Sequence, residues 1–271
     1  MISRPFTLKT IRDYGWFAIG AMLLLLGFVV VMMFAIDSMP MDKSHVWLNL
    51  KWVRRLISAM LGADLGDMFT RTGITSLVYT HPMMWTVLIS FILSLTSGVL
   101  AGEIDRGTMD SLATLPVSRS RYYISMTIAT LLYGLPLCWT LWVGVWLGRT
   151  LIGWSDVRMD LIAVLTVHLY IVYVFLSCLA VSVSALCNRR TTAVVICFVV
   201  VFYSFVLNLI GAFWPAAKEI AFTGFLDYYA PLPIVRDAAW RWGDIGVLLT
   251  AGAVFWTMGL IGFSRRDIPA R

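Results

Sequence analysis

Six long stretches of the sequence contain no Asp, Glu, Lys or Arg. They are 14–36, 82–102, 122–148, 161–188, 191–217 and 245–264. Each is at least 20 residues long, and a helix of about 20 apolar residues crosses the hydrocarbon core of a bilayer, which is roughly 30 Å thick. One charge at the centre of that core costs about 2.5–3.5 kcal/mol. The sequence therefore predicts an all-α polytopic membrane protein with six transmembrane helices.

The composition and the connecting segments agree with this prediction. The chain has 271 residues, of which 60% are hydrophobic and 13% charged, whereas about 25% of a soluble domain is charged. The outside connections, 37–81, 149–160 and 218–244, are at most 45 residues long. Such segments are too short to build a core of their own, so we expect residues 1–271 to form a single transmembrane domain.

The distribution of charge predicts the orientation. Eleven Lys and Arg and five Asp and Glu lie in the segments 1–13, 103–121, 189–190 and 265–271. The remaining segments hold ten Lys and Arg in total and ten Asp and Glu in total. Cationic residues concentrate in cytoplasmic loops. Both termini are therefore expected in the cytoplasm, and the net charge of +6 follows from topology without a nucleic-acid partner.

The motifs of self-sufficient transporters and membrane enzymes are absent from the sequence. It contains no G-x-x-x-x-G-K-[ST], no H-E-x-x-H and no G-x-S-x-G, so a P-loop, a zinc protease site and a serine nucleophile elbow are not expected. The four cysteines fall in or beside the apolar stretches without a Cys-x-x-Cys pair, which is typical of core residues. We expect no catalytic residue, metal or cofactor in this chain, and an energy source in another chain.

Three residues within the predicted spans are candidates for a substrate path or for polar positions in the core. His168 is the only histidine in the predicted spans, which contain no Asp, Glu, Lys or Arg. Asn208 lies near the outer end of the fifth span, and Trp142 belongs to an aromatic face of the third. An intramembrane histidine is a functional candidate, although a neutral imidazole bonded to a neighbouring helix is the simpler interpretation. Tryptophans near a span end are also typical of a membrane-interface anchor.

The first outside segment, 37–81, contains an amphipathic stretch. Its apolar residues 46, 50, 53, 57 and 60 recur at helical spacing, with cations between them. Such a helix either lies along the outer leaflet or packs on the other helices, and the segment is a candidate docking surface for an extracytoplasmic partner.

The stretch GEIDRGTMDSLATLPVSRSR, 102–121, is more structured than a turn needs to be. Thr108 is a suitable N-cap, Asp110 has the favourable sign for a helix N-terminus, and Leu112 and Leu115 lie on one side with Met109. Pro116 ends the helix. The pattern predicts a short helix parallel to the membrane, with an apolar face and a charged rim that fits a groove on a cytoplasmic partner.

This stretch resembles the cytoplasmic loop of type 2 ABC-transporter permeases, which contains the coupling helix. The matching residues are Glu103, Gly107, Thr108, Leu112, Leu115, Pro116, Val117, Ser118 and Arg119. The ending FSRRDIP, 263–269, is similar to the usual end of the family, and the predicted topology agrees over the whole chain. The first outside segment, 37–81, is longer than in many members.

The resemblance implies a permease subunit of an ATP-driven transporter, most simply an exporter, in the cytoplasmic (inner) membrane of a bacterium. It would pair in the bilayer with a second copy or a related permease chain, and with separate P-loop ATPase subunits that hold the ATP and Mg. The residues implied to contact the ATPase are Glu103, Asp105, Arg106, Gly107, Thr108, Asp110, Leu112, Leu115 and Pro116.

Two other functions stay open at this point. A permease similar to that of the nitrous oxide reductase maturation system would move no substrate and would pass mechanical work to an extracytoplasmic partner, which the length of segment 37–81 favours. More remotely, an intramembrane lipid enzyme would use His168 together with Asn208 or an outside acid.

Overall fold

A computed structural model describes residues 4–38, 70–107, 118–211 and 214–266, and every regular element in these ranges is a helix. Six helices are long and apolar enough to cross a membrane. They are α1 (Arg4–Asp37), α5 (Pro82–Val99), α8 (Arg119–Ile152), α9 (Met159–Leu186), α10 (Arg190–Gly211) and α13 (Trp242–Arg265). Within these ranges the predicted all-helical architecture is confirmed, with six helices long and apolar enough to span a membrane.

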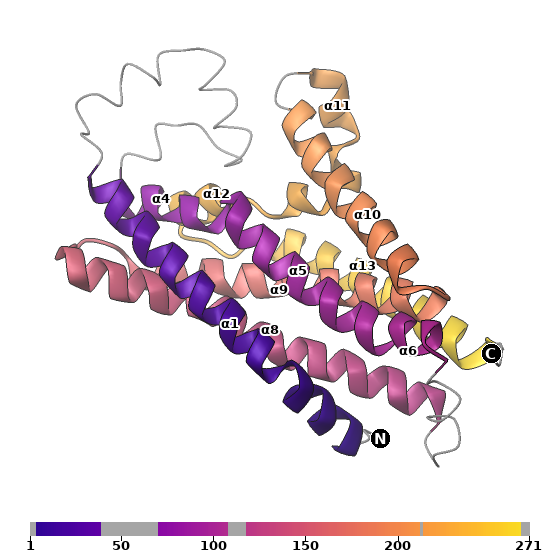
Figure 1. Ribbon diagram of the computed structural model, residues 1–271. Helices are drawn as coiled ribbons and strands as arrows, with labels where there is room; N and C mark the ends of the chain where they lie inside the picture. The colour runs from indigo at the N-terminus through magenta and orange to yellow at the C-terminus, as the bar shows by residue number, and fades with distance from the viewer. Residues whose placement is uncertain (1–3, 39–69, 108–117, 212–213, 267–271) are drawn as a thin grey trace.

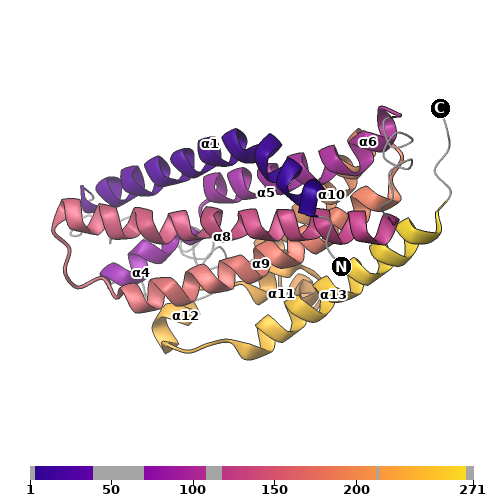
Figure 2. The same ribbon diagram turned by 90° about the horizontal axis from the view of Figure 1, so that it is seen from below.

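The bundle is built around α9. This helix contacts α5, α8, α10 and α13, while α1 packs chiefly on α8 (Figures 1 and 2). The helix α10 lies at the edge and leans away from the others toward α11 (Pro215–Glu219) (Figure 1). The start of α1, the short helix α6 (Ala101–Asp105) and the end of α13 lie at one end of the bundle, which we call the α6 end (Figures 1 and 2).

The helices follow the charge-free stretches but do not share their bounds. The helix α1 begins ten residues before its stretch, because charged residues at a helix end do not interrupt backbone hydrogen bonding. The helix α5 begins at Pro82 and is capped by His81, whose Nδ1 accepts a hydrogen bond from the Met83 amide at 3.2 Å. By contrast, α10 ends at Gly211, so the stretch 191–217 also includes the start of α11.

The opposite end of the bundle is covered by short helices. They are α4 (Arg71–Thr75), η2 (Ser76–Tyr79), α11, η3 (Ala221–Thr223), η4 (Phe225–Tyr228) and α12 (Pro231–Asp237). The Tyr79 hydroxyl is hydrogen-bonded to that of Thr166 on α9 at 2.8 Å, and Tyr229 donates to the Tyr79 carbonyl. The segment 218–244 therefore contains short helices and is not a plain loop. The amphipathic stretch 46–60 lies outside the described residues.

Glycines allow close helix contacts in the centre of the bundle. A Cβ atom on Gly134 of α8 would lie 2.2 Å from the ring of Tyr173 on α9, and one on Gly144 would lie 2.8 Å from Val29 of α1. Small residues let helix backbones approach within a membrane. The α1–α8–α9 side is thereby held together by direct backbone-to-side-chain packing.

Candidate functional site at the α6 end

The second spanning helix changes direction where it leaves the apolar stretch. The helix α5 stops at Val99, Leu100 adopts φ −113° and ψ −79°, and α6 then continues to Asp105. Gly107 ends this run with φ +72°, a left-handed conformation that glycine adopts without strain. The resulting corner places Glu103, Asp105 and Arg106 at the end of the bundle.

The charged residues of this corner bind the ends of neighbouring helices. Arg106 forms an ion pair with Glu103, with 2.8 Å between Nη2 and Oε1, and also donates to the carbonyl of Gly98 on α5. The Asp105 carboxylate accepts a hydrogen bond from the backbone N–H of Arg190 at the start of α10. An acidic group at a helix N-terminus is favourable for the helix dipole, so Asp105 stabilises the start of α10.

The other side of the loop is tied to the C-terminal end of the protein. Ser118 caps α8 by accepting a hydrogen bond from the amide of Arg121. The Arg119 side chain donates to the backbone carbonyl of Arg266. The Arg266 side chain in turn donates from Nη1 to the carbonyls of Ala185 and Cys187, at 2.9 and 3.2 Å. The last carbonyls of a helix lack partners within that helix, so Arg266 completes the end of α9.

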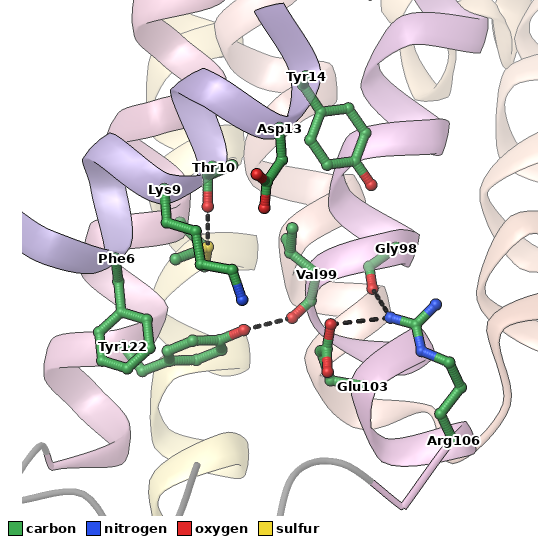
Figure 3. Close-up of a pocket in the computed structure, with 11 residues that line it drawn as sticks. Phe6, Lys9, Thr10, Asp13, Tyr14, Gly98, Val99, Glu103, Arg106 and Tyr122 are labelled. Atoms are coloured by element: carbon green, nitrogen blue, oxygen red, sulfur yellow. Dashed lines mark hydrogen bonds and ion pairs between the residues drawn. The ribbon is translucent and has the colours of Figure 1, made fainter. Parts of the chain in front are cut away.

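A cavity of about 210 Å³ opens beside this corner, between α1, the α5–α6 corner and the start of α8. Its charged lining residues are Lys9 and Asp13 of α1 together with Glu103 and Arg106 (Figure 3). The remaining lining residues are Phe6, Thr10, Tyr14, Gly98, Val99, Tyr122 and Met126. The cavity is therefore lined by charged side chains of both signs and by aromatic and apolar side chains.

A second, apolar hollow lies between α5 and α10. Two cavities of about 620 and 360 Å³ share the lining residues Thr80, Trp85, Phe202 and Phe205, and we call their union the α5–α10 groove. Arg190, whose Nε donates to Ser97 Oγ at 3.3 Å, lies at its α6 end. The groove offers an amphiphile or a neighbouring helix an aromatic wall with one cation at its end.

The three intramembrane candidates lie in different places. Asn208 lines the smaller part of the α5–α10 groove. Trp142 donates from Nε1 to the carbonyl of Met159 at 3.2 Å, so it joins α8 to α9. His168 is 2% exposed, stacks on Trp240 with 5.5 Å between ring centroids, and bonds through Nδ1 to the carbonyl of Val164. The bond of His168 is to its own helix and not to a neighbouring one, which differs from our simpler interpretation.

The predicted coupling helix is described only at its two flanks. Thr108, Asp110, Leu112, Leu115 and Pro116 lie outside the described residues. The described flanks contain Glu103, Asp105, Arg106 and Gly107 on one side and Ser118 and Arg119 on the other. The sequence alone did not single out Lys9, Asp13 and Arg190, although Asp13 and Arg190 directly precede charge-free stretches and Lys9 lies about one helical turn before Asp13.

Comparison with known proteins identifies the class. The family model described as "ABC-2 family transporter protein" matches residues 9–268. The chain therefore belongs to the ABC-2 type transporter permeases, as the resemblance of the 103–119 and 263–269 motifs indicated, and is a transmembrane subunit of an ABC transporter in a multi-pass membrane topology. No curated protein and no solved structure matches the chain.

Proposed function

We propose that this chain is the permease subunit of an ATP-driven exporter, moved by a separate P-loop ATPase that contacts the 103–119 segment. The α6 end then faces the cytoplasm, in agreement with the excess of cations there. In this scheme the ATPase holds the ATP and Mg, and a second copy or a related permease chain completes the transport unit in the bacterial inner membrane.

One observation carries the proposal. The residues on both sides of segment 108–117 are bonded to the ends of other spanning helices. Asp105 reaches α10, and Arg119 reaches Arg266, which reaches the end of α9. A displacement of the segment would therefore move several helix ends together, as rigid-body switching requires. A loop whose only task is to turn the chain needs no such connections.

The α5–α10 groove is the proposed place where this displacement acts. Asp105 binds the N-terminus of α10, whose side chains Phe198, Phe202 and Phe205 line the groove. When the α6 corner moves, α10 would move with it and change the width of the groove. We propose that substrate passes along this face, between the two permease copies, with Asn208 toward its far end.

Nucleotide-dependent labelling of the groove tests the proposal. The native membrane complex is first solubilised gently, and co-purifying proteins are identified by mass spectrometry. A Phe198→Cys variant of the complex is then labelled with a maleimide with and without a non-hydrolysable ATP analogue. The described native cysteines are buried, so labelling reports on position 198. We expect a stoichiometric ATPase and a labelling rate that changes several-fold with nucleotide.

The adjacent arginines Arg265 and Arg266 provide a matched pair of variants. Arg266→Gln removes the bonds to Ala185 and Cys187 and should reduce the nucleotide response. Arg265 is exposed, and Arg265→Gln should preserve the response. The proposed coupling is wrong if no ATPase can be trapped even by cross-linking. It is also wrong if the labelling rate of the Phe198→Cys complex, without a further substitution, is the same with and without nucleotide.

The alternative of a permease that transmits force without moving substrate depends on segment 37–81. The described part of this segment includes Arg71, which pairs with Asp156 at 3.0 Å. A stoichiometric extracytoplasmic protein in the same purified complex would favour this alternative over the exporter.

A further inference from the structure

The cavity beside the α6 corner lies at the depth of lipid head groups. Tyr14 is the first residue of the charge-free part of α1 and Gly102 the last of the second stretch. Asp13 and Glu103 are therefore the first charges beyond the hydrocarbon core on two helices that line the same cavity. Basic pockets between spanning helices on the cytoplasmic side bind anionic lipid head groups, and this cavity presents charges of both signs at the same depth.

One wall of the cavity carries two opposite charges without an ion-pair partner. Phe6, Lys9, Thr10, Asp13 and Tyr14 follow one face of α1 at helical spacing. Among the described residues, none forms an ion pair with Lys9 or Asp13. A lysine four residues before an acid is the less favourable order for pairing along a helix. Figure 3 shows both side chains directed into the cavity.

The opposite wall is neutral as a whole. Glu103 and Arg106 form an ion pair with each other there. The cavity therefore presents one uncompensated cation, Lys9, and one uncompensated anion, Asp13, to a ligand. The complementary ligand carries an anion and a cation close together, because a ligand with either charge alone would leave one of these two exposed side chains without a charged partner.

The remaining walls admit a head group and exclude acyl chains. The Tyr14 hydroxyl donates to the carbonyl of Ser94, and the rings of Phe17 and Phe91 stack at 5.3 Å, so the gap between α1 and α5 is closed toward the membrane centre. On the other side, the rings of Phe6 and Tyr122 meet edge to face at 5.4 Å. Acyl chains would have to lie outside, along the exposed face of α1.

We propose that this cavity binds the phosphate–ammonium head group of a phosphatidylethanolamine-type phospholipid. The Lys9 ammonium would bind the phosphate and the Asp13 carboxylate the ligand ammonium, as charge-assisted hydrogen bonds. A cavity of about 210 Å³ corresponds to roughly seven waters at about 30 Å³ each, which suits the approximately eight non-hydrogen atoms of phosphoethanolamine. A choline group has no N–H to donate to Asp13, and a phosphoglycerol group has no cation.

Native mass spectrometry of the purified full-length chain tests this site. The chain is stripped of lipid in detergent and titrated with phosphatidylethanolamine, phosphatidylcholine and phosphatidylglycerol of the same acyl chains. We expect phosphatidylethanolamine to bind about tenfold more tightly than phosphatidylcholine, the value of one charge-assisted hydrogen bond. Asp13→Asn should abolish that preference, and Lys9→Gln should weaken the binding of all three lipids. Arg12→Gln, an exposed neighbour that does not line the cavity, should match the unsubstituted chain.

Free phosphoethanolamine separates the two sources of this chemistry. If it displaces the lipid only at concentrations far above those at which phosphatidylethanolamine binds, the lipid is the ligand. If it binds the lipid-free chain as tightly as the lipid does, the site takes a soluble zwitterion. Equal affinities for the three lipids, or a preference that survives both Asp13→Asn and Lys9→Gln, would overturn the proposal. This assay contains no ATPase, so its failure leaves the proposed transport function untouched.

Discussion

The two sides of the bundle are built from different residues and hold together differently. On the α1–α8–α9 side, glycines of α8 receive side chains of the neighbouring helices, and Val29 and Met33 of α1 are fully buried against Gly144 and Gly148. On the α5–α10 side, large rings face a groove, and Phe198 and Phe202 are 56% and 57% exposed. One side is closed by contact, whereas the other leaves space.

This difference has a physical basis in the membrane. Lipid tails are as apolar as the side chains of a helix, so helices associate through close packing and hydrogen bonds instead of the hydrophobic effect. The glycine contacts of α8 supply such packing, and Tyr173 adds a hydrogen bond to the carbonyl of Thr130 at 3.0 Å. Among the described residues, no glycine of α5 or α10 receives a side chain of the other helix, and the hydrogen bond from Arg190 to Ser97 lies at the α6 end. We therefore expect a change of shape to cost least on this side.

The largest effect is expected from filling a contact on the closed side. Gly134→Leu would place atoms where the Tyr173 ring lies, and a Cβ alone would lie 2.2 Å from that ring. The ring must leave its position and its hydrogen bond, and overpacking of this kind costs about 3 kcal/mol. We expect a clear fall in the midpoint of thermal unfolding, measured in detergent, or failure to fold.

A second glycine provides the matched control. Gly20 lies in the middle of α1, and no atom lies within 4 Å of the position that a Cβ would take there. Gly20→Leu should leave the midpoint unchanged or raise it slightly, since leucine is a better helix former than glycine. If both variants lower the midpoint equally, the closed side owes nothing to the Gly134 contact.

An intermediate effect is expected at the α6 end of the α5–α10 side. Asp105→Ala removes the acceptor for the Arg190 amide at the start of α10, and a lost helix cap costs about 1 kcal/mol. The midpoint should fall by a few degrees at most, while maleimide labelling of the Phe198→Cys complex should lose much of its nucleotide dependence. The stability effect and the coupling effect are thus expected to differ strongly in size.

Asp156→Ala is the control for that variant. It breaks an exposed ion pair with Arg71 at the opposite end of the bundle, and exposed pairs contribute about 0–1 kcal/mol. Labelling of the groove should keep its nucleotide dependence. An Asp105→Ala complex that responds as the Asp156→Ala complex does would show that the α6 corner does not act on α10.

The sequence predicted the helices well because one physical requirement acts along the chain. A spanning helix must exclude charge over a fixed length, so the six stretches could be counted directly. Local signals also mark where helices begin or end, since Gly107, Pro82 and Ser118 act through their own backbones or caps. Helix bounds were less accurate because a helix can continue beyond the bilayer, as α1 does to Arg4.

The contacts of the candidate site could not be predicted in the same way. Arg119 and Arg266 are far apart in the chain, and nothing in their neighbourhoods indicates that they meet. The same applies to Asp105 and Arg190, and to Lys9 and Glu103 around one cavity. Such pairs depend on which helices are neighbours, and an apolar stretch is compatible with several neighbours. His168 likewise gave no sign that Trp240 covers it.

The smallest effect on stability is expected on the open side. Phe202→Ala removes a ring that is 57% exposed in the isolated subunit and stacks on Phe198 at 6.0 Å. Because this ring exchanges contact with protein for contact with lipid, its loss should change the free energy of unfolding by about 0.5 kcal/mol or less. If two permease copies meet along this face, the same substitution should nevertheless lower cross-linking between copies at Phe198→Cys. A large fall in thermal stability with unchanged cross-linking would reverse the comparison, since the groove would then be part of the fixed core and the moving surface would have to lie elsewhere.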